Sequence, residues 1–262
     1  MRRAILIFSA VFIAGCAATG TTPTSSSSAI PVSEQMPAGV AEKSAKTHTE
    51  LGTLYLEAGN FAVALEESRY AAATDPNYAP AYNLMGLVHL MLNETSQAKG
   101  AFERAIQLAP SDPQIANDYG WFLCVSGREQ EAFKYFETAS RNPLYRTPTR
   151  PYTNAGLCYL RIKDDKSAEM NFQRAVLLDG SNAQATYHLA SLSYKRGDYF
   201  NAKKLLGELH KLIEPNAESL WLGVRIERKI GDRQAEAGYS SQLRRKFAGT
   251  PEHQALMQGK FE

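Results

Sequence analysis

The chain has 262 residues, with 29 Lys and Arg against 27 Asp and Glu and a formal net charge of +2 at pH 7. Two of the basic residues, Arg2 and Arg3, lie in the first segment, and without them the two signs are balanced at 27 each. Nucleic acids and anionic membrane surfaces are recognised through a large positive field, so neither is expected as the main partner.

The chain begins with the pattern of a secretory signal, which we assign to residues 1–15. Arg2 and Arg3 precede an apolar run from Ala4 to Ala14, and small residues follow immediately before Cys16. A permanent membrane-spanning helix needs roughly 20 apolar residues, and this run is much shorter. The segment is therefore expected to direct export and to take no part in the fold.

The end of this signal, Ile13-Ala14-Gly15-Cys16, resembles the lipobox of bacterial lipoproteins. The resemblance implies that the Cys16 sulfur receives a diacylglycerol, that the chain is cut before Cys16, and that the new amino terminus is acylated. Two or more acyl chains, each stabilised by about 0.8 kcal/mol per buried methylene, hold a protein stably on a bilayer. Ala17 is similar to residues that permit export to the outer membrane, so a lipid anchor on its periplasmic face is expected. The alternative is an ordinary signal peptide.

Residues 16–44 are predicted to form a flexible tether. They are rich in Ser, Thr, Pro and Ala and contain few large apolar side chains. Such a segment buries too little apolar surface to offset the entropy lost on ordering.

Residues 45–250 contain six copies of one pattern, spaced by 33–36 residues. Each copy has a small residue and, twelve positions later, an alanine. The small residues are Gly52, Gly86, Gly120, Gly156, Ala190 and Gly223. The alanines are Ala64, Ala98, Ala132, Ala168, Ala202 and Ala235. A large side chain follows at Phe102, Phe136, Phe172, Leu206 and Tyr239, with Ser68 in the first copy.

This pattern resembles the tetratricopeptide repeat. The resemblance implies an all-α fold, a right-handed superhelical solenoid of six tetratricopeptide (TPR) repeats with a groove along its concave face. Each repeat is a pair of antiparallel helices that cannot bury its apolar face alone, so stacking supplies the core. Residues 251–262 are left as a C-terminal tail.

The repeats are interrupted at residues 140–152, where Pro143, Pro148 and Pro151 exclude a continuous helix. The second helix of repeat three is expected to stop near Asn142 and to be followed by a rigid loop. Two interpretations stay open for this loop, a tolerated surface insertion or a kink in the superhelix that contacts a partner.

Cys124 and Cys158 are the two cysteines apart from Cys16. They lie in different repeats at positions that are not equivalent, which favours buried free thiols, with a disulfide as the alternative in an oxidising periplasm.

The sequence offers no catalytic or metal-binding motif. The five histidines are scattered, and no His-x-x-x-His pair, Gly-x-Ser-x-Gly elbow or phosphate-binding glycine loop occurs. The acidic run Lys163-Asp164-Asp165-Lys166 is interpreted as the turn inside repeat four and not as a metal site. We therefore expect a protein that is not an enzyme and takes no cofactor, metal or small-molecule substrate.

A protein-binding groove is the expected site. In tetratricopeptide proteins the first helix of each repeat lines the groove, and two of its positions carry the residues predicted here to contact a partner: Asn83, Leu87, Asn117, Trp121, Thr153, Leu157 and Tyr187. The two amides would hydrogen-bond a peptide backbone while apolar pockets take its side chains. The alternative for Trp121 is ordinary packing between repeats. The lysine and arginine of the carboxylate-clamp relatives are missing from the matching positions.

Four short motifs resemble the PilF/PilW family of type IV pilus lipoproteins. They are Asn117-Asp118-Tyr119-Gly120, Leu144-Tyr145, the Leu-Gly-x-Arg stretch at 222–225 and Gln-Leu-Arg-Arg at 242–245. The resemblance implies a pilotin, which binds a secretin subunit of the type IV pilus machinery and brings it to the outer membrane, where it multimerises. The alternative is a lipidated TPR scaffold for outer-membrane protein insertion or cell-wall synthase regulation.

Overall fold

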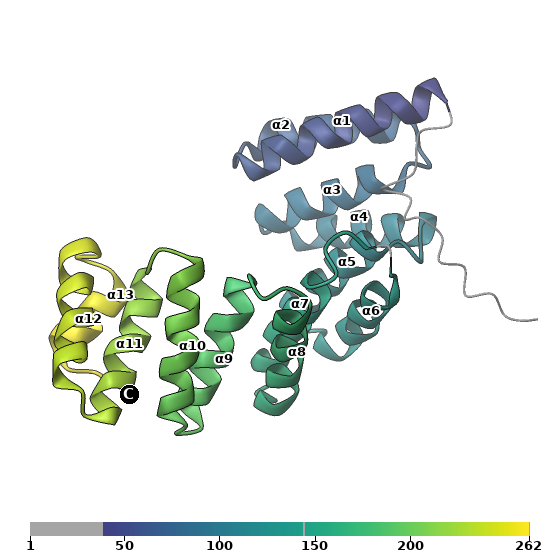
Figure 1. The fold of residues 1–262 in the computed structure, drawn as a ribbon. Coiled ribbons are helices and arrows are strands. Elements are labelled where there is room, and N and C mark those ends of the chain that lie inside the picture. The colour runs from purple at the N-terminus through teal and green to yellow at the C-terminus, as the bar shows by residue number, and fades with distance from the viewer. Residues whose placement is uncertain (1–38, 144, 262) are drawn as a thin grey trace, which may run out of the picture.

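A computed structural model of the chain describes residues 39–143 and 145–261 (Figure 1). The expected signal peptide, Cys16 and most of the tether lie outside these residues. The described residues form thirteen α-helices and no strand. The helices are α1 (Val40–Glu57), α2 (Phe61–Thr74), α3 (Ala79–Met91), α4 (Thr95–Leu108), α5 (Pro113–Val125), α6 (Glu129–Arg141), α7 (Arg150–Arg161), α8 (Asp165–Leu178), α9 (Ala183–Lys195), α10 (Tyr199–Leu212), α11 (Ala217–Ile230), α12 (Arg233–Lys246) and α13 (Pro251–Gln258).

The first twelve helices form six antiparallel pairs stacked in chain order, as the repeats predict. The pairs are α1 with α2, α3 with α4, and so on to α11 with α12. The helix axes turn along the stack, from nearly horizontal in α1 to α4 to nearly vertical in α9 to α12 (Figure 1). The predicted all-α architecture of six tetratricopeptide repeats is confirmed.

A residue with positive φ closes the turn inside every pair. Gly59, Gly127, Gly197 and Gly231 occupy this position in four repeats, because glycine meets no steric penalty in the left-handed region. Asn93 and Lys163 take its place in repeats two and four. The run that begins at Lys163 is thus the predicted turn, and the Asp164 side chain accepts a hydrogen bond from the Ser167 amide at 3.0 Å and caps α8.

The small residue of each repeat lets the paired helices approach closely. A Cβ atom built on Gly156 would lie 2.6 Å from Cε1 of Phe172, and one on Gly86 would lie 2.8 Å from the ring of Phe102. In the first repeat, a different side chain fills the space beside the small residue. Ser68 is too small to fill the space, and Leu84 from the next repeat fills it, with its Cδ2 2.7 Å from where a Cβ built on Gly52 would lie.

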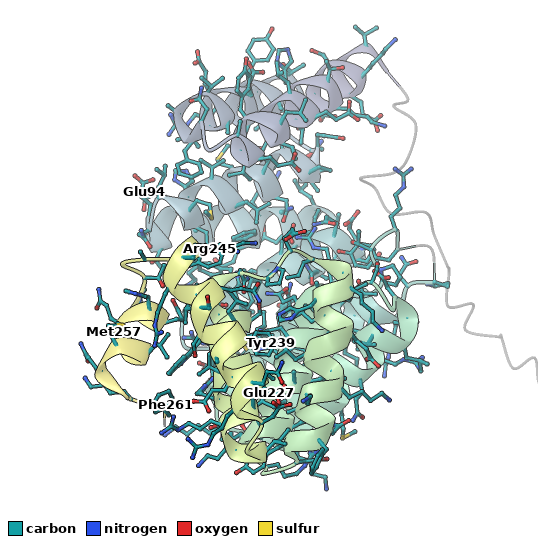
Figure 2. The ribbon with its side chains drawn as sticks, turned by 60° about the vertical axis from the view of Figure 1, so that its left-hand side comes forward. Glu94, Glu227, Tyr239, Arg245, Met257 and Phe261 are labelled. Atoms are coloured by element: carbon teal, nitrogen blue, oxygen red, sulfur yellow. A yellow bond between two sulfur atoms is a disulfide. The ribbon has the colours of Figure 1, made fainter. Side chains whose placement is uncertain are left out.

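Helices are present on both sides of the predicted repeat region, residues 45–250. Helix α1 begins at Val40, inside the segment assigned to the tether, because Ala45 is fully buried against Ala71 in the core of the first repeats. The predicted tail contains α13, which has no counterpart in the repeat pattern. Thr250 caps it, Leu256 is buried, and Figure 2 shows α13 against the end of the stack with Met257 directed outward.

The proline-rich loop separates α6 from α7 as predicted, since α6 ends at Arg141 and is capped by Asn142. The loop folds back onto repeat three. Tyr145 is buried against Ala116 and Ala139, and its hydroxyl donates to Gln114 Oε1 at 3.1 Å. Burial raises the pKa of Tyr145 to about 12, so this hydroxyl stays a donor at neutral pH.

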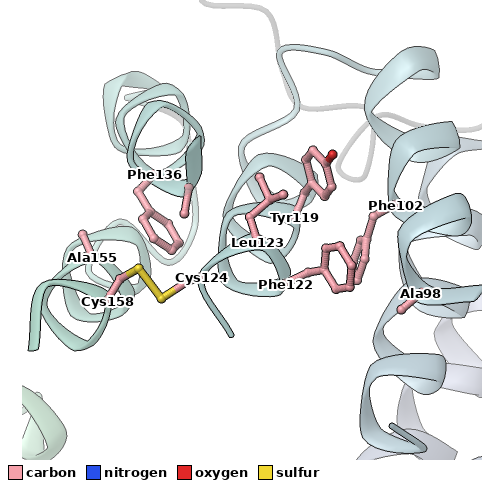
Figure 3. Packing of buried hydrophobic residues seen from close by; sticks show 10 residues of the cluster. Ala98, Phe102, Tyr119, Phe122, Leu123, Cys124, Phe136, Ala155 and Cys158 are labelled. Atoms are coloured by element: carbon pink, nitrogen blue, oxygen red, sulfur yellow. A yellow bond between two sulfur atoms is a disulfide. The ribbon is translucent and has the colours of Figure 1, made fainter. Parts of the chain in front are cut away.

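The interpretation of Cys124 and Cys158 as free thiols is wrong, because they form a disulfide between α5 and α7 with their Cα atoms 5.8 Å apart (Figure 3). Cys124 lies four residues after the small residue of repeat three, and Cys158 lies two residues after that of repeat four. These non-equivalent positions face each other wherever two first helices meet. Other junctions bring together Leu56 with Val88, Leu90 with Phe122, and Leu160 with Leu192.

Candidate protein-binding groove

The first helices of repeats one to four line a cavity of about 270 Å³, which we call the groove. Its walls come from Thr49 and Thr53 of α1, Leu87 of α3, Gln114 of α5 and Arg150 of α7, among others. These residues lie far apart in the sequence and meet because each first helix packs against the first helix of the next repeat. The cavity has both apolar and hydrogen-bonding groups, as peptide-binding grooves do.

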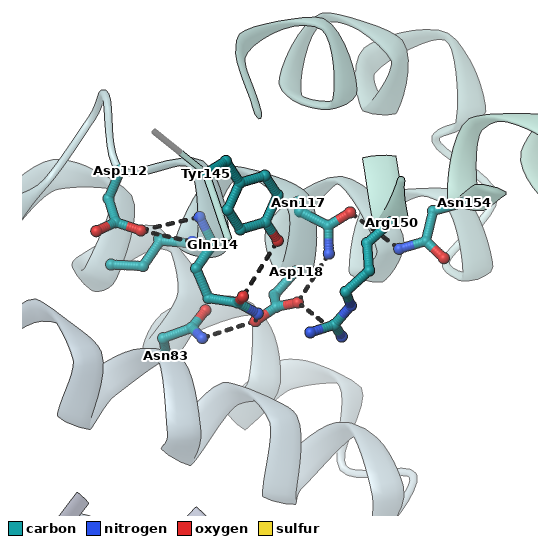
Figure 4. Close-up of polar contacts among 9 residues, drawn as sticks. Asn83, Asp112, Gln114, Asn117, Asp118, Tyr145, Arg150 and Asn154 are labelled. Carbon is teal, nitrogen blue, oxygen red and sulfur yellow. Dashed lines mark hydrogen bonds and ion pairs between the residues drawn. The ribbon is translucent and has the colours of Figure 1, made fainter. Parts of the chain in front are cut away.

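A buried polar network forms the floor of the groove (Figure 4). At its centre, the carboxylate of Asp118 is only 2% exposed. It accepts hydrogen bonds from Asn83 Nδ2 at 2.8 Å, Gln114 Nε2 at 2.8 Å and Asn117 Nδ2 at 3.0 Å. The guanidinium of Arg150, half exposed, lies 3.7 Å away. The charge of Asp118 is therefore compensated by three amides and one arginine.

The network joins three repeats. Asn83 lies on α3, Asp118 on α5 and Arg150 on α7, and Asn154 of α7 donates to Asn117 Oδ1 at 3.0 Å. Removal of one partner would leave the buried charge of Asp118 with less compensation, so these hydrogen bonds favour one register of the three first helices.

Three of the predicted groove residues belong to this buried layer or to its continuation. Asn83 and Asn117 hydrogen-bond within the network instead of presenting their amides to solvent. Thr153 is also buried, donating to the Thr149 carbonyl at 3.1 Å and accepting from Asn182 Nδ2 at 3.0 Å.

The other four predicted residues are partly buried. Leu87 lines the groove, and Trp121 packs with it against the cluster that contains the disulfide. Leu157 packs against the cluster of repeats four and five. Tyr187 lies elsewhere, in a cavity of about 440 Å³ between repeats five and six. The structure therefore brings Asn83 and Leu87 together in one cavity and separates Tyr187 from them.

Sequence reasoning missed Gln114, Asp118 and Arg150 as groove residues. Asp118 gave a usable signal, since it is the one charged residue of α5, next to Tyr119 and Gly120. A charge in such a position is retained when neighbouring donors compensate it. Arg150 gave no such signal, because its position depends on how the proline-rich loop ends.

No group of three or more His, Cys, Asp and Glu side chains in residues 39–143 and 145–261 is arranged to hold a metal ion. Within the same residues, none of the helices has both the length and the apolar character needed to cross a bilayer.

Comparison with known families agrees with the repeat assignment. Tetratricopeptide repeat models match residues 49–113 and 83–144, and a further one matches residues 149–182. The paired helices, the small residues at the pair contacts and these matches make the chain a tetratricopeptide repeat protein, a class of scaffolds for protein–protein interaction.

Individual relatives of the chain are proteins of type IV pilus assembly. The chain is 27% identical to the type IV pilus assembly protein PilF of Pseudomonas aeruginosa over 257 residues, which cover 97% of each protein. A solved structure of P. aeruginosa PilF has a TM-score of 0.76 and 28% identity, covering 84% of this chain and 99% of that one. The crystal structure of PilW, a type IV pilus biogenesis factor, has a TM-score of 0.75 and 26% identity, covering 81% and 98%. The chain is therefore a tetratricopeptide repeat homologue of the type IV pilus assembly proteins PilF and PilW.

Proposed function

We propose that the chain is an outer-membrane lipoprotein pilotin, which binds the type IV pilus secretin and promotes its localisation and multimerisation in the outer membrane. The observation that carries the proposal is the similarity to PilF over 97% of both chains, because it includes the N-terminal segment as well as the repeats. A groove lined by four repeats supplies a surface for a segment of the secretin.

The lipid anchor and the tether give this binding a location. A triacylated Cys16 would keep the repeats on the periplasmic face of the outer membrane, and the tether would let them search the space beside it. Secretin subunits bound to the repeats would then be concentrated where the ring forms.

The first prediction concerns delivery. Cys16→Ser removes the sulfur that the acyl chain needs, so the protein is expected in the soluble periplasmic fraction, and heat-resistant secretin multimers are expected to disappear from outer membranes. Cells that lack the chromosomal gene and carry one variant of it are fractionated, and immunoblots follow this protein and the secretin. Ser26→Ala, in the same segment, is the matched control and should restore multimers. Multimers restored fully by Cys16→Ser would contradict the proposal. Secretin multimers that form normally in cells lacking the gene would favour a role in another envelope assembly.

The second prediction concerns capture. Leu87→Ala with Trp121→Ala is expected to weaken binding of a purified secretin fragment by about 2 kcal/mol, or roughly thirtyfold in Kd, as for aromatic anchors at interfaces. Binding is measured by calorimetry at a temperature where circular dichroism shows both proteins folded.

The matched control for this pair is Leu177→Ala with Phe200→Ala, which removes two exposed apolar side chains from second helices. The control should bind as the unmodified protein does. Equal weakening in both pairs, or none in either, would mean that the groove is not the capture site.

A further inference from the structure

The junction between repeats five and six departs from a rule that the other junctions obey. At the earlier junctions the facing positions of successive first helices are apolar or form the disulfide, as in Leu56 with Val88 or Leu160 with Leu192. At the last junction the same positions carry Tyr194 and Arg225. A guanidinium therefore stands where every other junction has an apolar side chain or a half-cystine.

Arg225 is held by aromatic rings and not by a carboxylate. Its guanidinium carbon lies 4.9 Å from the centroid of the Tyr194 ring and 5.7 Å from that of Trp221. Its Nε is buried and has no hydrogen-bond partner, and no ion pair of the described chain includes Arg225. A buried donor without a partner destabilises the folded chain, whereas a leucine in this position would leave no polar group unpaired.

Further cations line a cavity at the end of the stack, which Phe261 and Trp221 connect to this arginine. Trp221 stacks on Phe261 with ring centroids 5.5 Å apart, and Figure 2 marks Phe261 beyond α13. Phe261 lines a cavity of about 760 Å³ together with Arg228, Lys229 and Lys260, and none of the lining side chains in the described part of the chain is acidic. Arg228 lies over the Phe261 ring at 3.9 Å and pairs with Glu236 at 2.9 Å.

The acidic side chains of the region do not neutralise the site. Glu227 is buried and paired with Lys203 at 2.8 Å, and Glu236 is used by Arg228. Burial raises the pKa of Tyr187, and the charges of Glu218 and Glu252 raise it further while that of Arg225 lowers it, so all three charges lie near this tyrosine. Neither glutamate forms an ion pair with Arg225. Among the described residues, Arg225, Lys229 and Lys260 have no ion-pair partner, so their positive charge can take part in binding an anionic ligand.

We propose that Arg225, with Tyr194, Trp221, Phe261 and Lys260, forms a second binding site, the terminal arginine site, for an acidic peptide segment. Arginine stacked on aromatic rings is the arrangement that presents a planar fork of donors to a carboxylate. Arginine and tryptophan are also the residues that dominate binding at protein interfaces. The protein that carries this acidic segment would be the captured secretin, and that identity rests on the proposed function. The site itself is tested directly with a peptide.

The probe is an acetylated, amidated octapeptide of alternating Glu, Asp and Leu, and its control has Gln and Asn in place of the acids. Trp221 reports binding by fluorescence in a Trp121→Phe background, where no other tryptophan remains. The acidic peptide is expected to bind at low ionic strength, to weaken as salt is raised, and to bind at least tenfold more tightly than its neutral control.

Arg225→Leu restores the apolar pattern of the other junctions, so the melting temperature should be kept or raised while peptide affinity falls at least tenfold. Arg174→Gln is the matched control, since Arg174 also lies over a tyrosine ring, that of Tyr152 at 6.0 Å, on another helix pair. Its affinity for the acidic peptide should be unchanged.

Unchanged affinity of Arg225→Leu for the acidic peptide, or an equal loss of affinity in Arg174→Gln, would overturn the proposal. So would Arg225-dependent binding of phosphatidylglycerol vesicles without binding of the peptide, which would assign the arginine to a membrane surface. The groove variant at Leu87 and Trp121 separates this inference from the proposed function, because it should lose secretin capture and keep peptide binding.

Discussion

Replacement of both Cys124 and Cys158 by serine is expected to lower the free energy of unfolding by about 3–4 kcal/mol. The disulfide joins residues 34 positions apart, and closing a loop of this size removes about that much conformational entropy from the unfolded chain. The two sulfurs also lie in the cluster with Phe122 and Phe136, where serine hydroxyls would be poorly placed. The measurement is chemical denaturation followed by circular dichroism, with the oxidised protein as reference.

The position of this bond makes its loss more than a uniform destabilisation. It connects the first helices of repeats three and four, which the proline-rich loop separates by two extra residues. Repeat proteins are stabilised through contacts between neighbours, so weakening one junction is expected to split the transition into two. Cys124→Leu with Cys158→Val copies the Leu56 and Val88 pair and should keep a single transition at a smaller loss. Equal stability of the serine variant and the oxidised protein would contradict the assigned role.

The helix pairs could be predicted from the sequence because every repeat must satisfy the same packing. Gly120 and Phe136, or Gly156 and Phe172, are contacts inside a repeat, so the spacing alone locates them. The turn at Lys163 was recognised for the same reason, since its register matches four glycines.

Contacts between repeats were harder to predict, because they depend on how far one helix is displaced along the next. Comparison of equivalent positions made Cys124 and Cys158 look unrelated, although the displacement brings them together. The same displacement turns Asn83 and Asn117 toward Asp118 and away from solvent. Helix α13 belongs to no repeat and had only the local signals of Thr250 and Pro251.

Phe172→Ala is expected to lower the free energy of unfolding by about 3–5 kcal/mol, the usual range for a phenylalanine removed from a closed core. The side chain is fully buried, and its ring fills the space that the absent side chain of Gly156 leaves. Denaturant unfolding of the variant measures the loss. Met170→Ala, on the same helix with a side chain 61% exposed, is the matched control and should differ little from the unmodified protein.

The same contact predicts a specific coupling between the two positions. Gly156→Ala places a Cβ 2.6 Å from Phe172 and should cost about 1–3 kcal/mol, whereas Gly100→Ala, with open space around it, should gain up to about 1 kcal/mol from helix propensity. Repeat five shows the compensated form, with Ala190 in the small position and Leu206 in the filler position, both buried. The double variant Gly156→Ala with Phe172→Leu should therefore lose less than the sum of its single changes. Strictly additive losses would mean that this pair of side chains does not determine how closely the two helices of a repeat approach.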